Sequence, residues 1–339
     1  MKLLLNEDLI FFMKPAFTLN FLNYNKFLLF ILAFLSLPII ASAHTRWFAQ
    51  GELEPFVTNE PTVLYLSGCA LIAFVILLIA YIFERNKILQ LNFLQPKSGN
   101  AFNRASSVLS IITGTFFMIA GTHGYLFSPN LNYGIDIPTT MIASQFLIGL
   151  MLVLGIYARL GALALMFLWF LGIAYGGVEA LIENAWVLSI ATFIFIMGND
   201  YYGLSVESLK SIAKRFEKYA LPILRIGTGA TLLILGFSEK IFQPELGINF
   251  LTQYQWNFMQ SFGFSDYLFV LSAGSVEALL GLLLILGLVT RMTAVVIAIL
   301  FTIPIFIIGP IELAGHLPHF IAVVMLIIFG AGSCLKLGK

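Results

Sequence analysis

Residues 277–292 read EALLGLLLILGLVTRM, and residues 312–320, after an apolar run, read ELAGHLPHF. This segment places two carboxylates, an arginine and two histidines in a stretch up to Gly330 that is otherwise almost all hydrocarbon. The whole chain of 339 residues is 60% hydrophobic and 10% charged, with a mean hydropathy of +0.96. Soluble domains carry about 25% charged residues, so the composition predicts an all-α polytopic membrane protein.

The same segment has a counterpart 132 residues earlier, at Gln145–Gly198. The run LLLILGLVTR at 282–291 corresponds to LMLVLGIYAR at 150–159. Identical residues pair as Gly281 with Gly149, Gly287 with Gly155, Arg291 with Arg159, Gly309 with Gly177, Leu313 with Leu181 and Gly330 with Gly198. An internal duplication explains this spacing most economically.

Apolar runs long enough to cross about 30 Å of hydrocarbon follow one another along the chain. Before them, 26–43 resembles a secretory signal, with Ala41 and Ala43 at −3 and −1 before His44. This segment is either cleaved there or kept as a first span. Because lipid offers no partner to free backbone groups, we expect nine further helical spans, at about 61–83, 105–127, 139–157, 160–176, 182–198, 219–242, 267–289, 292–309 and 317–334.

Lysine and arginine predict the orientation of these spans. Twelve basic residues fall on one side if the helices alternate, against only Arg46 and Lys240 on the other. The twelve are Arg85, Lys87, Lys97, Arg104, Arg159, Lys210, Lys214, Arg215, Lys218, Arg291, Lys336 and Lys339. The basic side is therefore predicted to be cytoplasmic, with His44 outside a bacterial inner membrane.

The duplication defines the predicted domains. There are two four-helix units, at 105–198 and 219–339, joined by a cytoplasmic linker at 199–218. They are preceded by a tail and signal-like segment (1–43), an outer polar segment (44–60) and a single span with its cytoplasmic loop (61–104). The first halves of the units align with a shift of 115 residues and the second halves with 132, so the second unit has 17 extra residues near 245–265. An even number of helices gives both units the same topology, related by an axis along the membrane normal.

The second unit resembles the DoxX family of four-helix membrane proteins. The matching motifs are Arg225-xxx-Gly229, Gly236-xxx-Lys240-xxx-Pro244, Glu277-xxx-Gly281, Leu286-Gly287-xxx-Arg291 and Gly315-His316. The HTRWF sequence at 44–48 is similar to the start of larger, duplicated relatives. The resemblance implies quinone-linked redox work in the membrane, of the thiosulfate:quinone oxidoreductase type. No haem, dinucleotide or nucleophile-elbow motif occurs in the chain, so a redox partner protein is expected to supply the electrons.

The ionisable residues of these motifs occur only in the second unit. At the shifted positions the first unit has Gln145 for Glu277, Asn184 for His316, Gly124 for Glu239, Tyr125 for Lys240 and Ser110 for Arg225. We infer that the second unit carries the chemistry and that the first is mainly structural.

The candidate catalytic residues are Glu277, Lys240 and His316. Glu277 lies near the centre of its span, where an acidic residue costs roughly 2.5–3.5 kcal/mol on insertion scales. It is predicted to carry protons or to bond a quinone headgroup, with Lys240 as counter-charge. Candidate cofactor ligands are Glu239, His319 and Arg225. Each has a structural alternative: an interhelical hydrogen bond for Glu277, snorkelling for Lys240, polar residues at the interface for the histidines, and headgroup binding for Arg225.

The four histidines suggest a metal site as well. His44, His123, His316 and His319 all fall on the predicted outer side. If the signal is cleaved, the new amino terminus and imidazole of His44 could bind copper or zinc together with the other imidazoles. The alternative is that His44 belongs to a cap that packs Trp47 on the bundle and binds no metal.

Three functions remain open from the sequence. The first is a membrane subunit of a quinone-linked oxidoreductase. The second is a transporter or channel for a small solute or proton, which a buried glutamate fits and the lack of inverted repeats disfavours. The third is a non-catalytic assembly or metal-handling protein. The absence of a basic stripe predicts no binding to nucleic acid.

Overall fold

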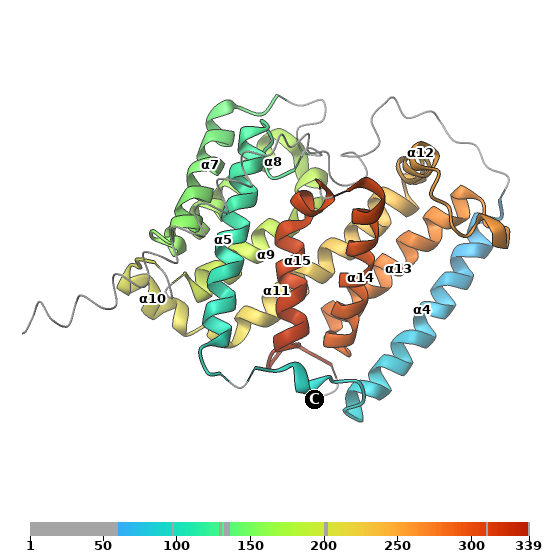
Figure 1. Cartoon of the computed structure of the whole chain (residues 1–339), viewed down its shortest axis with the longest axis horizontal. Helices are drawn as coiled ribbons and strands as arrows, with labels where there is room; N and C mark the ends of the chain where they lie inside the picture. The colour runs from blue at the N-terminus through green and yellow to red at the C-terminus, as the bar shows by residue number, and fades with distance from the viewer. Residues whose placement is uncertain are drawn as a thin grey trace, which may run out of the picture. The chain divides into compact units, whose positions relative to one another are not determined.

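The computed structural model describes residues 60–96, 98–128, 131, 136–199, 203–309 and 311–337. These residues all belong to one compact unit, Ala41–Lys339. Within them every regular element is a helix, apart from a single bridge between Ile156 and Leu204 (Figure 1). The predicted all-helical class is confirmed for these ranges. The signal-like segment and His44 lie outside the described residues.

One helix stands before two groups of four. It is α4 (Thr62–Arg85). The first group comprises α5 (Ala101–Thr122), α7 (Thr139–Leu154), α8 (Ala158–Glu183) and α9 (Ala185–Met197). The second comprises α11 (Glu217–Leu235) with its π-helical extension η2 (Gly236–Ile241), α13 (Asp266–Leu286), α14 (Thr290–Ile308) and α15 (Ile311–Phe329).

Shorter elements connect these helices. They are η1 (Asn92–Leu94), α10 (Glu207–Lys214), α12 (Pro244–Tyr254) and η3 (Gln260–Phe262). The last two occupy the predicted insertion, where the rings of Trp256 and Phe258 pack on Phe269 of α13. The insertion is therefore a folded cap on the start of α13, built on aromatic contacts.

Helices occur at all nine predicted spans, but they differ in length. Six helices among the described residues are long and apolar enough to cross a bilayer, which supports an integral membrane protein. Three others are shorter apolar helices: α7 (Thr139–Leu154), α9 (Ala185–Met197) and the part of α15 from Gly315 to Phe329. The 13 residues of α9 extend about 20 Å at roughly 1.5 Å per residue, less than the ~30 Å of hydrocarbon. Helix α8, which precedes α9, has 26 residues and a break at Gly177.

Two pairs of glycines bring helices into backbone contact. A Cβ built on Gly114 of α5 would lie 2.5 Å from the carbonyl oxygen of Gly149 on α7. A Cβ built on Gly229 of α11 would lie 2.6 Å from the carbonyl oxygen of Gly281 on α13. Such close approach is the usual reason for small residues at helix crossings in membranes.

The turns between helices show the same kind of pairing. Gly155 and Gly287 both end their helices with a left-handed conformation, and Tyr157 and Val289 both begin the next helix with φ values of 51° and 38°. Arg159 donates to the carbonyl of Ile196 and Arg291 to that of Ile328. All three pairs are separated by 132 residues, the shift found in the sequence.

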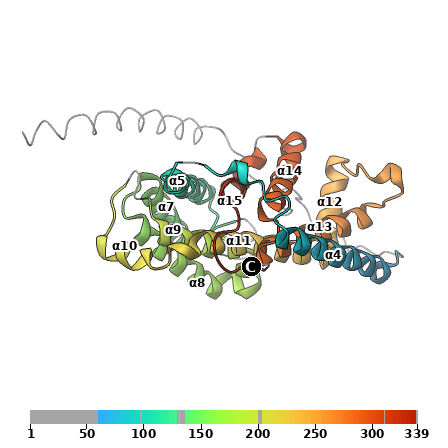
Figure 2. The same cartoon turned by 90° about the horizontal axis from the view of Figure 1, so that it is seen from below.

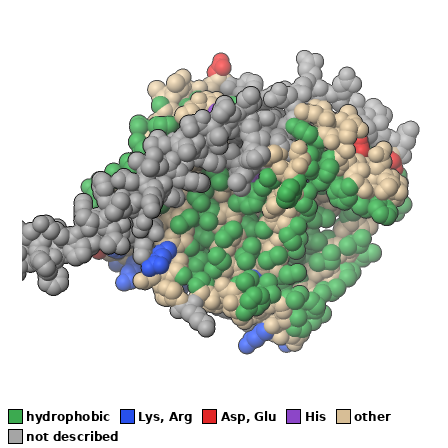
Figure 3. Space-filling view, in the orientation of Figure 1, with side chains coloured by type: hydrophobic (Ala, Val, Ile, Leu, Met, Phe, Trp, Pro, Cys, Tyr) green, Lys and Arg blue, Asp and Glu red, His purple; other side chains and the backbone are tan. Residues whose placement is uncertain are grey.

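The two groups also pack on each other in a reciprocal way. Helix α11 of the second group packs on α9 of the first, and α15 of the second packs on α5 of the first. Helix α4 leans on α13, as both views show (Figures 1 and 2), and Tyr65 Oη lies 2.5 Å from Ser272 Oγ there. Much of the outward surface is hydrophobic, with Lys and Arg at the lower margin of the view (Figure 3). We define the basic end by Arg85, Lys218 and Lys336, whose segments are joined by the Glu84–Lys336 ion pair and by the bond from Cys334 Sγ to the Lys218 carbonyl oxygen.

The glycine crossing yields a stability prediction. Gly281→Ala should lower the melting temperature in detergent, because the added methyl meets the Gly229 carbonyl oxygen at 2.5 Å and the Leu233 nitrogen at 2.7 Å. Overpacking of this kind costs about 1–3 kcal/mol. Gly68→Ala is the matched control, since nothing lies within 4 Å of a Cβ at that position on α4. Equal melting temperatures for the two variants would contradict the prediction.

Candidate functional site

The site is centred on an ion pair between two helices of the second group. Lys240 Nζ lies 2.8 Å from Glu277 Oε2, with side chains 19% and 27% exposed, respectively. Glu277 comes from the middle of α13 and Lys240 from η2 at the end of α11. The structure thus brings together the two residues that the sequence analysis named as charge and counter-charge.

Small residues make this pair possible. A Cβ on Gly236 would lie 2.7 Å from the carbonyl oxygen of Gly274, so η2 and α13 touch through their backbones. A Cβ on Gly274 would lie 2.8 Å from Cβ of Lys240. The lysine stem therefore runs across Gly274, and its ammonium group reaches Glu277 less than one turn further along α13.

The π-helical geometry of η2 distinguishes this end of α11. A π-turn inserts one extra residue into a helix and is frequent at functional sites. It places the buried Glu239 directly before Lys240, at the same end of the bundle. The site therefore combines two carboxylates and one ammonium group within two helices.

The equivalent place in the first group holds an amide satisfied by the backbone. Gln145 Oε1 accepts from the Phe127 nitrogen at 2.7 Å, and Nε2 donates to the carbonyls of Tyr125 and Phe117 at 3.0 and 3.3 Å. Gln145 is fully buried. Tyr125, at the position of Lys240, contributes only its backbone. The amide here closes a helix end, whereas the carboxylate in the second group faces the ammonium group of Lys240.

His316 and His319 form a second cluster, at the contact between the groups. Both are buried, and their ring centroids lie 6.1 Å apart. The His316 ring lies 5.3 Å from that of Phe301, and the His319 ring lies 5.0 Å from that of Trp186 on α9. The shared face expected from an i, i+3 spacing is thus occupied by aromatic rings from both groups.

The predicted start of the helix that carries these histidines was wrong. The span predicted at 317–334 would have Pro318 in its first turn, but α15 begins at Ile311 and Pro318 lies inside it. A proline inside a helix removes one backbone hydrogen bond. In membrane proteins neighbouring helices allow this, so the proline did not mark the boundary.

The histidine metal site remains a prediction. His123 caps the end of α5, with its Nδ1 2.9 Å from the Ile119 carbonyl oxygen and its ring stacked on Tyr125. In the described part of the chain no group of three or more His, Cys, Asp or Glu side chains could hold a metal ion. His44, on which the idea depends, lies outside that part.

Arg225 sits at the other end of α11 from Lys240. It is fully buried, and its guanidinium donates to the backbone carbonyls of Leu284, Ile285, Ala331 and Leu335. These bonds join α11 to the end of α13 and to the chain after α15. The structure therefore does not bring Arg225 to the Lys240–Glu277 pair. Arg225 instead has a structural role, and we call its bonds to these backbone carbonyls the Arg225 clasp.

Sequence reasoning missed Glu84, which completes this clasp. It is buried, accepts from the Val289 nitrogen at 3.0 Å and lies 3.1 Å from Lys336 Nζ. Arg291 donates nearby to the Gln90 carbonyl and to Asn92 Oδ1. The sequence did contain a signal for this role, because Glu84 is an acidic residue directly before Arg85, at the basic end of a span.

The ion pair can be tested by a double-mutant cycle. Lys240→Met and Glu277→Leu should each lower the melting temperature in detergent, because a single change leaves one charge half-buried and unpaired. The double variant should lose less than the sum of the two single losses, because it removes both charges. Strictly additive effects of the two substitutions would show that the side chains are not coupled.

The first group allows the reciprocal test. Gln145→Glu should destabilise the protein, because a carboxylate oxygen would face the carbonyl oxygens of Tyr125 and Phe117 in place of the amide donor. An unsatisfied buried polar group costs about 1–3 kcal/mol. Ser144→Ala, at an exposed neighbouring position, serves as the control. A stable Gln145→Glu protein would mean that the amide bonds matter little.

Comparison with known proteins identifies one region. The DoxX family model matches residues 220–310, which include Lys240, Glu239 and Glu277 but not His316. No curated protein and no solved structure matches the chain. The match covers α11 to α14, the helices that form the ion pair and its glycine crossing. The C-terminal part of the chain, at residues 220–310, is therefore similar to the DoxX family.

Proposed function

We propose that the protein is a membrane subunit of a quinone-linked oxidoreductase system, with Lys240 and Glu277 as its polar site. DoxX is a membrane family often linked to subunits associated with quinone oxidoreductases. The observation that carries the proposal is the partly exposed ion pair at 2.8 Å within an apolar helix pair of the matched region. Charged residues are rare at such depth and usually mark a functional site.

The donor set suits a quinone headgroup. A quinone carbonyl oxygen accepts a hydrogen bond, which the Lys240 ammonium group can donate. Its reduction also consumes protons, and Glu277 is the nearest side chain that can pass them on. Lys240 uses one carboxylate oxygen, Oε2, and Glu277 keeps part of its surface accessible. A bound quinone would supply two-electron, two-proton chemistry. The chain's own residues would orient the headgroup and move protons, while a redox partner protein would deliver the electrons.

The buried histidines have a secondary place in this proposal. His316 and His319 lie at the contact of α15 with the first group. An imidazole ring has two nitrogens that can donate and accept protons, so these side chains could relay protons at the same end of the bundle. Glu239, buried and directly before Lys240 in η2, adds a second acidic group to the site.

The tandem organisation and the topology form part of the same proposal. The paired glycine crossings, left-handed turns and arginine bonds support two copies of one four-helix unit, preceded by α4. Nine spans then place the basic end in the cytoplasm, by the excess of Lys and Arg. The ion pair accordingly faces the extracytoplasmic half of the membrane, and Gln145 marks the copy that has kept only its structural role.

The activity test uses the complex purified from its native membrane. Glu277→Gln should preserve expression and melting temperature better than Glu277→Leu, yet lose most of the thiosulfate-dependent reduction of an added quinone analogue. The reason is that an amide keeps the hydrogen-bonding shape but cannot carry a proton. General acid–base groups typically contribute a factor of about 10²–10⁴ to the rate. The measurement is the initial rate of quinone reduction.

Glu245→Gln is the matched control, because it makes the same change in α12, at the same end of the same domain. It should leave the rate unchanged. Full activity of Glu277→Gln would remove Glu277 from the mechanism. A wild-type complex that reduces no quinone with any sulfur donor would remove the redox proposal, and uptake into proteoliposomes driven by a pH gradient would favour transport in its place.

A further inference from the structure

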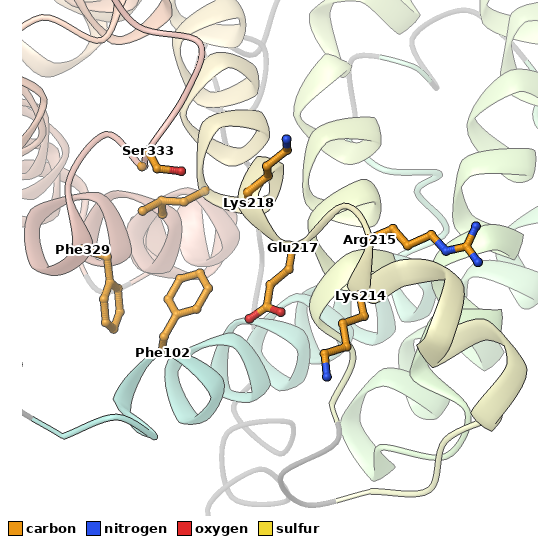
Figure 4. A pocket seen from close by; sticks show the side chains of 9 residues that line it. Phe102, Lys214, Arg215, Glu217, Lys218, Phe329 and Ser333 are labelled. Carbon is orange, nitrogen blue, oxygen red and sulfur yellow. The ribbon is translucent and has the colours of Figure 1, made fainter. Parts of the chain in front are cut away.

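A surface cavity at the basic end lies apart from the ion pair. It has a volume of about 580 Å³ and is lined by Phe102, Lys214, Arg215, Glu217, Lys218, Leu221, Phe329, Gly332 and Ser333. These residues come from the start of α5, the end of α10, the start of α11 and the end of α15 (Figure 4). The cavity thus opens where the two helix groups meet, at the opposite end of α11 from Lys240.

Its wall has an apolar part and a charged part. Phe102 and Phe329 pack edge to face with centroids 4.9 Å apart, and Leu221 is buried beside them. Three basic side chains and one acidic side chain, Glu217, make up the charged part and leave a net charge of +2. Figure 4 shows the Glu217 carboxylate near Phe102, while Arg215 points away from the aromatic pair. An apolar slot beside a basic rim is complementary to an amphiphile with an anionic head.

Helix α10 places this rim at the surface of a membrane. It is only eight residues long, with Lys210 and Lys214 on a polar face, and Ile212 and the following Phe216 are 47% exposed. A short helix with exposed apolar and basic side chains lies in the interface of a bilayer. Basic pockets between membrane helices bind anionic lipid headgroups.

We propose that this cavity binds an anionic phospholipid of the leaflet at the basic end. The headgroup lies at the charged rim that carries Lys214 and Lys218 on its two sides, and an acyl chain runs along Phe102 and Phe329 into the seam between α5 and α15. The lipid would fill the contact between the two helix groups where the start of α5 meets the end of α15. This site is independent of the proposed redox function.

The test is native mass spectrometry of the full-length protein in detergent with equal amounts of phosphatidylglycerol and phosphatidylcholine of the same acyl chains. Wild-type protein should retain phosphatidylglycerol in preference. Lys214→Gln/Lys218→Gln should reduce that preference by about tenfold or more, because each basic side chain near anionic lipid contributes a factor of about five. Glu217→Gln should increase it, an effect that partial misfolding cannot produce.

Arg85→Gln/Lys87→Gln is the matched control, since it removes two charges at the same end but outside the cavity lining. It should keep the preference. Equal losses in both double variants would overturn the site in favour of a diffuse charge effect. Equal retention of both lipids by the wild type would indicate an apolar slot without headgroup selectivity and would also overturn the proposal. Displacement of the lipid by millimolar inorganic phosphate alone would identify a soluble anion as the occupant.

Discussion

The backbone contact between α11 and α13 is the constraint on which the site depends. Gly229 with Gly281, and Gly236 with Gly274, hold the two helices too close for any side chain between them. Lys240 and Glu277 flank this contact, so their charged groups meet without room for a separating water layer. In hydrocarbon such a pair is costly to form and costlier to break on one side only. The glycines thus fix the geometry, and the geometry makes both charges tolerable.

The two helix groups show what the charge replaces. Gln145 uses its amide to bond three backbone groups at the end of α5. In the second group α11 continues into a π-helical segment, and the Phe242 nitrogen bonds the Phe237 carbonyl oxygen. The backbone there is satisfied without help from residue 277. A side chain freed from a structural bond can take up chemistry, which is the physical basis for assigning function to the second group.

The fold was largely readable from sequence, and the site only in part. Apolar runs predicted the helices because each span must satisfy its backbone hydrogen bonds within itself. The pairing of Lys240 with Glu277 followed from the scarcity of charge on one side. The boundary at Pro318 failed because tertiary packing overrides the local effect of proline. Glu84 was missed because its partners, the Val289 nitrogen and Lys336, lie about 200 or more residues away.

The charged groups at the two ends of the bundle differ in what they bond to. At the basic end, Arg225, Arg291 and Glu84 are buried and bond largely to backbone carbonyl or amide groups, which do not move or titrate. Such bonds lock the turns after α13 and α15 and leave the charged groups unavailable to a ligand. At the opposite end Lys240 and Glu277 bond each other through flexible side chains and keep some exposure. A ligand can compete for a side-chain partner far more easily than for a backbone one. Of these two sets of charged groups, therefore, only the Lys240–Glu277 pair can readily exchange partners.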